Sequence, residues 1–333
     1  MFQEHDPGSF HCESPRRLAA IDRALEAWEG LGECEELALV PATAEQLERV
    51  HSPEHIERIA STAGGAFSLD PDTQTSPRSY EVALAAAGSL AALCERVAKG
   101  EFNCGFAMVR PPGHHATAHR AMGFCLFNNV AVAAAHLLNA VGLERVMIVD
   151  WDVHHGNGTE AIFYADPRVL YFSTHQYPFY PGTGAVDDTG SGEGRGYTVN
   201  VPLAPGHDEL DYLRIFTELF LPVAEQYAPQ LIIVSAGFDP HMADPLGGMR
   251  VSSEGFGAMA QVVLKAAEKV CPGKVVFALE GGYAVDAQAE AVIKVLEAVR
   301  GADYSSIIER AGSQSPPPEL ASAISVQREY WKF

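Results

Sequence analysis

The chain has 333 residues, and 23 Lys and Arg against 43 Asp and Glu give a formal net charge of −20. With 47% hydrophobic and 20% charged residues it can bury a large core, which excludes an intrinsically disordered protein. The negative charge would repel phosphate backbones and favour basic ligands, so we expect no binding to nucleic acid.

No membrane-spanning or exported segment is expected. The longest apolar stretch, residues 130–143, is interrupted by His136 and Asn139 and is shorter than the ~20 residues that a membrane span needs. The N-terminus carries acidic residues where a signal peptide would carry basic ones. Scattered cysteines without a Cys-x-x-Cys pair favour reduced thiols that pack in the core, and therefore a cytoplasmic protein. They are Cys12, Cys34, Cys94, Cys104, Cys125 and Cys271.

Helical and strand-like segments alternate along most of the chain. Apolar spacing and capping residues predict helices over residues 15–28, from 53 onward, 80–98, 129–138, 208–227, 253–270 and 285–299. Short apolar runs predict strands at residues 106–109, 146–149, 169–172, 231–234 and 275–278. Such runs are typical of strands buried on both faces of a parallel sheet. The order predicts the α/β class, with a single open, mostly parallel β-sheet and helices on both faces.

The alternation stops near the C-terminus. Residues 313–318 are rich in serine and proline and show no apolar periodicity. We therefore expect one domain over residues 1–312, followed by a proline-rich linker and a C-terminal tail over residues 313–333.

Polar side chains cluster directly after several predicted strands. In open parallel sheets ligands bind beyond the carboxyl ends of the strands, so we expect these side chains to share one rim. They are His114 and His115, then Asp150, Asp152, His154 and Asn157, then Asp239, and finally Glu280 and Tyr283.

Asp152, His154 and Asp239 are candidate metal ligands. Asp152 and His154 are two residues apart, so in an extended chain their side chains point to the same side. Zinc accepts carboxylate oxygen and imidazole nitrogen, and a catalytic site keeps one position open for water. The alternative is that the aspartates cap helices and the histidines make surface hydrogen bonds. That alternative accounts for single residues better than for the whole set at successive strand ends.

His114, His115 and Tyr283 are candidate catalytic residues. The histidines follow a Pro-Pro-Gly turn, and taken alone each is equally well explained as a loop residue. Beside a metal, a histidine is the natural general base or acid near neutral pH, and Asp150 would keep one ring charged and oriented. Tyr283 follows two glycines, a hinge that lets a phenol reach a cavity; its alternative is ordinary core packing.

A series of motifs in the chain resembles the histone deacetylase family of the arginase-deacetylase superfamily. The resemblance runs from about residue 14 to about residue 299. It implies the arginase-deacetylase fold, with residues 1–312 as the catalytic domain, and a zinc-dependent amidohydrolase that removes acetyl or other short acyl groups from an acylated amine. The motifs are Pro111-Pro112-Gly113-His114-His115, Gly123-Phe124-Cys125, the segment from Asp150 to Gly158, Tyr180-Pro181-Gly182-Thr183-Gly184, Ser235-Ala236-Gly237-Phe238-Asp239 and Glu280-Gly281-Gly282-Tyr283.

The resemblance also implies roles for single residues. One zinc ion per chain would be held by Asp152, His154 and Asp239. His115 would be the general base and later the acid, His114 with Asp150 an electrostatic stabiliser, and Tyr283 the donor to the oxyanion. Asn157 stands where class I members carry an aspartate behind the second histidine, which resembles class II. Structural potassium ions are implied near Asp150, Asp152, His154, Ser173 and Thr174, and near Phe163, Asp166, Val169 and Tyr197. The substrate channel would be lined by Gly123, Phe124, Tyr180 and Leu246, and an acetate cavity by Arg17.

The identity of the acylated amine is left open by the resemblance. Acetylpolyamine deacetylases are close relatives, and an acidic surface suits a lysine-bearing protein as well as a polyamine. Leu246 stands where a polyamine-selective relative carries a glutamate. Because leucine cannot pair with a second ammonium group, we favour an acyl-lysine or a neutral acylamide, and most of all acetyl-lysine-type substrates. A non-catalytic acetyl-lysine binding protein is the alternative of a different class, but we would expect it to lack Tyr283 or a ligand. Whether the protein forms homo-oligomers is also left open by the resemblance.

Overall fold

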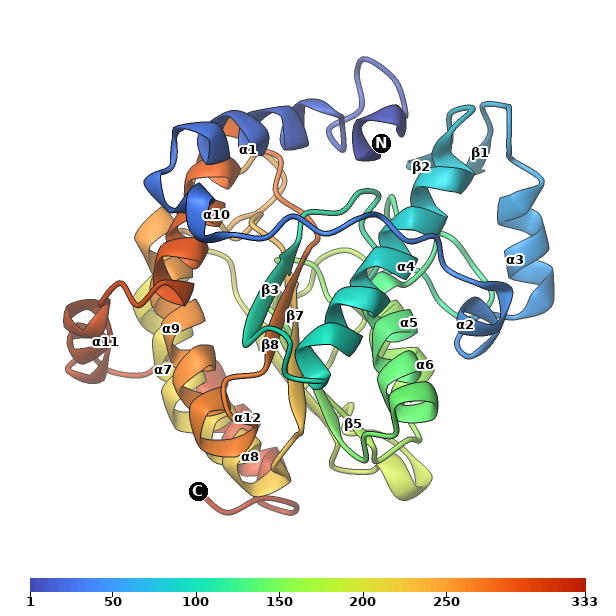
Figure 1. Ribbon diagram of the computed structural model, residues 1–333. Coiled ribbons are helices and arrows are strands. Elements are labelled where there is room, and N and C mark those ends of the chain that lie inside the picture. Colours follow the sequence, from blue (N-terminus) through green and yellow to red (C-terminus); the bar gives the residue numbers. More distant parts are fainter.

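A parallel sheet forms the centre of the protein in the computed structural model, which describes residues 1–333 (Figure 1). Its 6 strands are arranged in the order β3-β8-β7-β4-β5-β6, and every neighbouring pair is parallel. The predicted open α/β sheet is thereby confirmed. The strands are β3 (Cys104–Ala107), β4 (Val146–Asp150), β5 (Val169–Gln176), β6 (Thr198–Leu203), β7 (Leu231–Ala236) and β8 (Val275–Leu279).

β4, β5, β7 and β8 begin where predicted and end later, at Asp150, Gln176, Ala236 and Leu279, whereas β3 and β6 differ further from the prediction. β3 begins at Cys104, two residues before the predicted apolar run, and ends at Ala107. β6 was not predicted, because Asn200 and Pro202 interrupt its apolar sequence. Proline is tolerated in an edge strand, where one side of the backbone has no partner, and β6 pairs with β5 alone.

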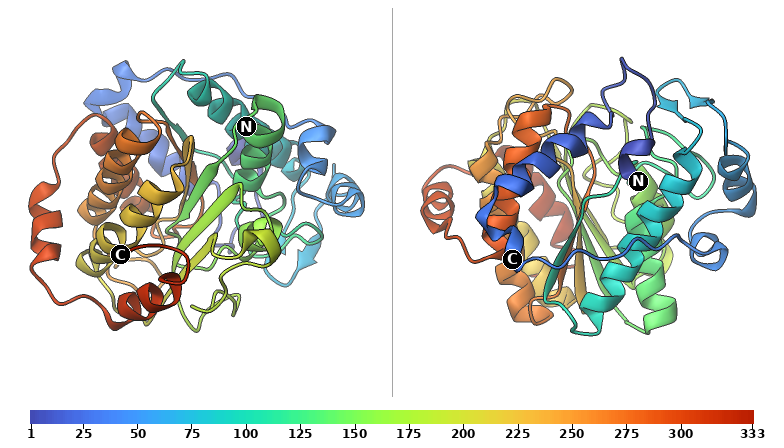
Figure 2. Two further views of the ribbon diagram at one scale, coloured as in Figure 1. Left: turned by 90° about the horizontal axis from the view of Figure 1, so that it is seen from below. Right: turned by 45° about the horizontal axis from the view of Figure 1, so that its top comes forward.

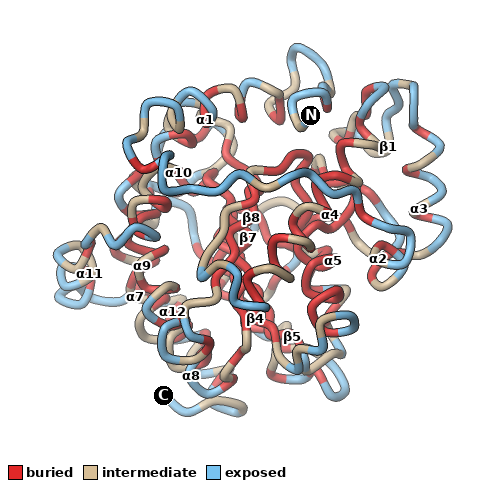
Figure 3. Tube along the Cα trace, viewed as in Figure 1, coloured by how far each residue is buried: buried red, intermediate tan, exposed pale blue.

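Helices cover both faces of the sheet, as Figures 1 and 2 show. Side chains of β4 alternate between two buried clusters: Met147 and Val149 pack on the side of α7 to α10, Val146 and Ile148 on the side of α4 and α5. All of β4 is therefore buried, which explains its continuous apolar sequence (Figure 3). The helices are α1 (Arg16–Ala27), α2 (Ala44–Glu48), α3 (Pro53–Ala60), α4 (Ser79–Ala98), α5 (Asn129–His136), α6 (Asn157–Phe163), α7 (Glu209–Ile215), α8 (Leu221–Tyr227), α9 (Ser253–Val270), α10 (Val285–Val299), α11 (Ser305–Gly312) and α12 (Pro318–Gln327).

Two of the predicted helices include a π-helical turn. The helix predicted over residues 208–227 is α7 and α8 joined by a π-helical turn at Phe216–Phe220. A second π-helical turn, Leu137–Val141, extends α5. The helix expected from residue 53 is α3, with the Ser52 side chain accepting the His55 N–H as its cap. No helix combines the length and the apolar character that crossing a membrane requires.

The remaining elements are short or lie at the C-terminus. A hairpin of β1 (Ser68–Asp70) and β2 (Thr73–Gln74) stands apart from the main sheet. 3-10 turns lie at Phe2–Glu4, Glu29–Glu33 and Gly192–Gly194. α12 lies against β6, with Leu320 and Ala323 buried. Part of the segment 313–333 thus covers the unpaired edge of the sheet.

Candidate active site

The polar segments that follow β3, β4, β7 and β8 meet at the carboxyl edge of the sheet. Asp150 is the last residue of β4 and pairs in register with Ser235 of the neighbouring strand β7. From these strand ends the structure brings His114, His115, His154 and Tyr283 together in the lining of one pocket with a cavity volume of about 220 Å³.

Asp152, His154 and Asp239 converge. Each offers a ligand atom, and these atoms lie within 4.8 Å of one another. The Nδ1 atom of His154 lies 3.1 Å from Asp152 Oδ1 and 3.1 Å from Asp239 Oδ2. The expected extended geometry is wrong, however. β4 ends at Asp150, and the next residues form tight turns in which Asp152 N–H donates to Asp150 Oδ1 and His154 N–H donates to Asp152 Oδ1.

The electrostatics of this trio favour a cation. Burial and the charge of Asp152 raise the pKa of Asp239 to about 7. Burial alone would lower the pKa of His154, but hydrogen bonds to Asp152 and Asp239 raise it to about 10. The trio therefore needs positive charge between its carboxylates. Two carboxylates and one imidazole form a donor set that fits a zinc ion with one position left for water or substrate.

Glycines make room for these carboxylates. A Cβ atom on Gly281 would lie 2.2 Å from Asp239 Oδ2, and one on Gly237 would lie 2.1 Å from Asp152 Oδ2. Gly281 N–H also donates to Asp152 Oδ2 at 2.9 Å. Close approach of backbone to carboxylate thus requires glycine at residue 281, in addition to any freedom that the glycines give to Tyr283.

The adjacent residues His114 and His115 have different hydrogen-bond partners, a carboxylate for the first and a neutral amide for the second. His114 Nδ1 lies 3.0 Å from Asp150 Oδ2, and His115 Nδ1 lies 2.8 Å from Asn157 Oδ1. Although burial opposes it, the charges of Asp150 and Asp152 raise the pKa of His114 well above its ordinary value. Burial, together with His114 and His154, lowers the pKa of His115 well below its ordinary value. An amide oxygen only accepts, so the Nδ1–H of His115 donates to Asn157 and its Nε2 is left as the basic atom.

Aromatic side chains form part of the wall of the pocket. Phe124 lies edge-to-face on Tyr283 with ring centroids 5.8 Å apart, and Tyr180 lies edge-to-face on His115 at 5.1 Å. Gly123 and Leu246, both predicted to line a substrate channel, are part of the lining. The pocket residues are Asp72, Pro112, His114, His115, Gly123, Phe124, His154, Phe179, Tyr180, Leu246, Gly281 and Tyr283.

Two lining residues, Phe179 and Asp72, lie outside all of the predicted motifs. Phe179 stacks on His154, with ring centroids 5.3 Å apart and planes 17° apart; its position directly before Tyr180 was the available signal. Asp72 lies in the turn between β1 and β2. No strand-end pattern marks Asp72, because its approach to the pocket depends on where the hairpin docks.

Arg17 is fully buried behind Tyr283 and is not among the lining residues. Its Nε–H donates to the carbonyl oxygen of Gly282 at 2.7 Å, and Nη1 donates to the buried Glu13 at 3.0 Å. Its guanidinium carbon lies 5.1 Å from the ring centroid of Tyr283. Arg17 therefore places a buried positive charge against the ring of Tyr283.

The residues implied for potassium form two groups. Asp150 pairs in register with Ser173, and the hydroxyl of the adjacent Thr174 is buried without a hydrogen-bond partner. In the second group, Asp166 N–H donates to Phe163 O and Val169 N–H donates to Asp166 O in the turn between α6 and β5. Tyr197 adjoins this turn, since its carbonyl oxygen accepts the Tyr171 N–H of β5. Within each group these contacts place the named residues beside one another, in the sheet or in the turn next to it.

Comparison with known proteins agrees with this geometry. Residues 11–299 match the family described as Histone deacetylase domain. The chain is 39% identical over 313 residues to the protein named Probable deacetylase of Archaeoglobus fulgidus, covering 92% of this chain and 86% of that protein. It is 41% identical over 298 residues to the Histone deacetylase-like amidohydrolase of Pseudomonas aeruginosa, with 88% and 78% covered.

A solved structure shares the fold. The HD domain of HDA15 matches with a TM-score of 0.90 at 36% identity, covering 99% of this chain and 92% of that chain. This match confirms the predicted arginase-deacetylase fold. Some relatives are longer: the chain spans 49% of Histone deacetylase 5 of Arabidopsis thaliana. Because the family match extends over residues 11–299, the chain belongs to the histone deacetylase family and is a deacetylase hydrolase.

Proposed function

We propose that the protein is a zinc-dependent deacetylase that removes acetyl or other short acyl groups from acetyl-lysine-type substrates. The observation that supports this most strongly is the trio of Asp152, His154 and Asp239, whose ligand atoms lie within 4.8 Å of one another. His154 of this trio lines an aromatic-walled pocket. A base and an oxyanion donor, His115 and Tyr283, line the same pocket.

Zinc bound by the trio would supply Lewis-acid activation of the amide carbonyl and of the attacking water. His115 Nε2 takes the proton of that water, because Nδ1 is engaged by Asn157. His114, kept charged by Asp150, stabilises the negative charge that develops. Tyr283 donates its hydroxyl proton in a hydrogen bond to the tetrahedral oxyanion, a contact whose loss typically costs about 10² to 10³ in rate. His115 then protonates the leaving amine.

The pocket lining supports an acyl-lysine over a polyamine. Phe124 and Tyr180 offer aromatic walls to an aliphatic side chain, and Leu246 adds a further apolar contact. Acetylpolyamines are the second candidate, and the observation that favours them is the carboxylate of Asp72 in the lining, which suits an ammonium group. The two candidates differ in where a second positive charge would lie.

Further proposals concern the surroundings of the pocket. We propose structural potassium ions at the groups around Asp150 and Asp166, supported by the unpartnered buried hydroxyl of Thr174 in the first group and by the backbone carbonyl oxygens of the turn in the second. The buried guanidinium of Arg17 supports an inner cavity that receives the released acetate. All six cysteines are free, which supports a cytoplasmic location.

Metal removal and reconstitution test the proposal. Protein treated with a chelator should lose acetate release from an acetyl-lysine peptide, and one equivalent of Zn²⁺ should restore it. The same preparation is then assayed with N-acetylputrescine, and a higher kcat/KM for that amine would favour the polyamine candidate. A protein that binds the acetylated peptide but releases no acetate at any zinc loading would instead be a binding protein.

A further inference from the structure

Tyr283 needs a fixed backbone if its hydroxyl is to meet an oxyanion. The two residues before it are glycines, and Gly282 has a φ of +119°, a conformation open mainly to glycine. Such a segment does not hold itself in place. The groups that contact its backbone therefore decide where the phenol points.

One buried carboxylate, that of Asp244, accepts the backbone N–H groups of Tyr283 and Ala284. Asp244 lies in the segment between β7 and α9 and is 8% exposed. Its Oδ2 atom accepts the N–H groups of Tyr283 at 2.6 Å and Ala284 at 3.1 Å. Its Oδ1 atom accepts the N–H groups of Leu246 at 2.9 Å and Gly247 at 3.4 Å. Asp244 thus joins the loop of the channel residue Leu246 to the loop of Tyr283.

The peptide bond between Gly282 and Tyr283 is held from both sides. Its N–H donates to Asp244 Oδ2, and its carbonyl oxygen accepts from Arg17 Nε at 2.7 Å. Arg17 and Asp244 are both buried, so little water competes for either hydrogen bond. The plane of this peptide bond, and with it the Cα–Cβ direction of Tyr283, is fixed between a cation and an anion.

We infer that Asp244 is a positioning residue for the reaction: through the backbone of Tyr283 it holds the phenol hydroxyl where the oxyanion forms. The inference rests on the proposed role of Tyr283 as the oxyanion donor. Asp244 touches no reacting atom and acts only through this hydrogen-bonded loop.

Substitutions at Asp244 give the first test. Asp244→Ala removes all these acceptors and should lower kcat by about 10², the scale of a reacting group misplaced by about 1 Å. Asp244→Asn keeps one acceptor oxygen but turns an NH₂ group toward backbone donors, and should lower kcat by about 10-fold with KM little changed. If the alanine variant does not fold, the asparagine variant carries the test. Asp208→Asn is the matched control, since Asp208 also accepts backbone N–H groups but caps α7 outside the pocket.

A double-mutant cycle then isolates the route through Tyr283. In the Tyr283→Phe background, which has no hydroxyl to position, Asp244→Asn should change kcat by no more than about twofold. With a trifluoroacetyl-lysine substrate, whose oxyanion the fluorines already stabilise, the losses in both single variants should shrink together. Hydrogen–deuterium exchange of the zinc-free protein should be faster at residues 281–284 in Asp244→Asn and unchanged there in Asp208→Asn.

The outcomes separate the two claims. Equal losses from Asp244→Asn in both backgrounds, or equal losses with both substrates, would overturn the positioning role. A low kcat in Tyr283→Phe with normal kcat in Asp244→Asn would overturn the role of Asp244 and leave the proposed function standing. Wild-type turnover in Tyr283→Phe would contradict the proposed role of Tyr283 and this inference with it.

Discussion

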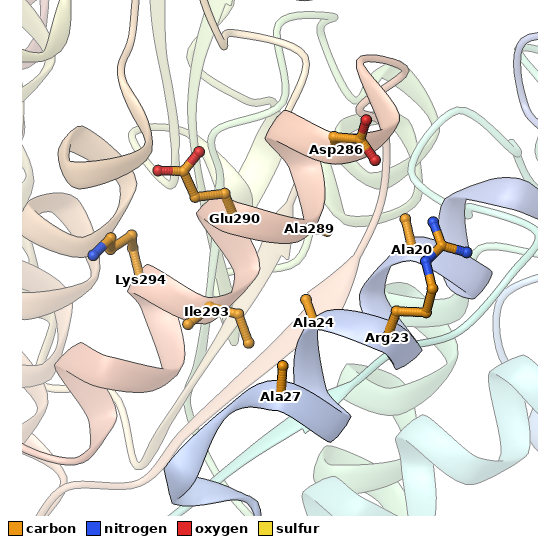
Figure 4. A pocket seen from close by; sticks show the side chains of 9 residues that line it. All are labelled: Ala20, Arg23, Ala24, Ala27, Asp286, Ala289, Glu290, Ile293 and Lys294. Atoms are coloured by element: carbon orange, nitrogen blue, oxygen red, sulfur yellow. The ribbon is translucent and has the colours of Figure 1, made fainter.

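Two hollows on this protein differ in what they can do. The larger is a groove between α1 and α10 with a volume of about 440 Å³, and the smaller is the pocket of about 220 Å³ at the carboxyl edge of the sheet. Figure 4 shows the groove, where small side chains such as Ala24 and Ala289 form the floor and Arg23, Glu290 and Lys294 stand at its margins.

The groove and the pocket differ more importantly in how far water reaches their charged side chains than in their volumes. In the groove, Lys294 pairs with Glu297 at 3.1 Å, and both side chains are partly exposed, at 24% and 33%. In the pocket, His114 and Asp150 pair at 3.0 Å with side-chain exposures of 3% and 0%. Water screens the first pair and not the second. Buried polar groups that converge from separate strand ends, rather than the volume of a cavity, therefore identify the site.

The largest effect is expected from the proposed metal ligands. Asp239→Ala removes one of the three proposed ligands and leaves His154 with the carboxylate of Asp152 alone, so deacetylase activity should fall by about three decades or more. Zinc content and acetate release check this together. Asp286→Ala, at the rim of the groove, is the control and should retain both. Full amidase activity in zinc-free wild-type protein would contradict the metal site.

A smaller but still large effect is expected from Tyr283→Phe. The variant lacks only the hydroxyl, so fold and zinc content should survive while kcat falls by about two decades. Thermal unfolding and metal analysis establish that the protein is intact. Turnover near that of the wild type would show that the oxyanion is stabilised by other groups.

A moderate effect is expected at Leu246, which lines the pocket. Leu246→Glu places a negative charge within reach of the distal ammonium of a polyamine, partly screened by solvent. The kcat/KM for N8-acetylspermidine relative to an acetyl-lysine peptide should rise by about 2- to 5-fold, the scale of a solvent-exposed ion pair. Leu246→Gln is the control, because glutamine is polar like glutamate but carries no charge; it should leave the kcat/KM ratio unchanged. A fall in this kcat/KM ratio would show that residue 246 does not select between polyamine and peptide substrates.

No effect on catalysis is expected in the groove. Arg23→Ala combined with Lys294→Ala removes two charges at the rim of the larger hollow, and kcat/KM should stay within about twofold of the wild type, as for most surface substitutions. Steady-state kinetics with the acetyl-lysine peptide measure it. A tenfold loss of kcat/KM would show that the groove is functionally coupled to the pocket.

Several features of the fold and site were predictable because they depend on local sequence. Apolar runs over the first four residues mark β4, β5, β7 and β8, since strands covered on both faces bury the side chains that point to either side. Polar residues directly after such strands must lie at one edge of a parallel sheet. That rule places Asp152, His154 and Asp239 in one region, and the structure brings their ligand atoms within 4.8 Å of one another.

Other features were decided by contacts between distant segments. β6 is a strand because β5 offers it an open edge, and α12 packs against β6 although prolines precede it. Asp72 reaches the pocket through the docking of a hairpin, and Asp244 holds Tyr283 across 39 residues of sequence. The tight turns after Asp150, not an extended strand, join Asp152 to His154. Hydrophobic patterning is local, and it is therefore enough to predict near which residues the strands end. The backbone groups that each buried carboxylate accepts depend on segments far apart in the chain, because those hydrogen bonds form once separate segments have packed together.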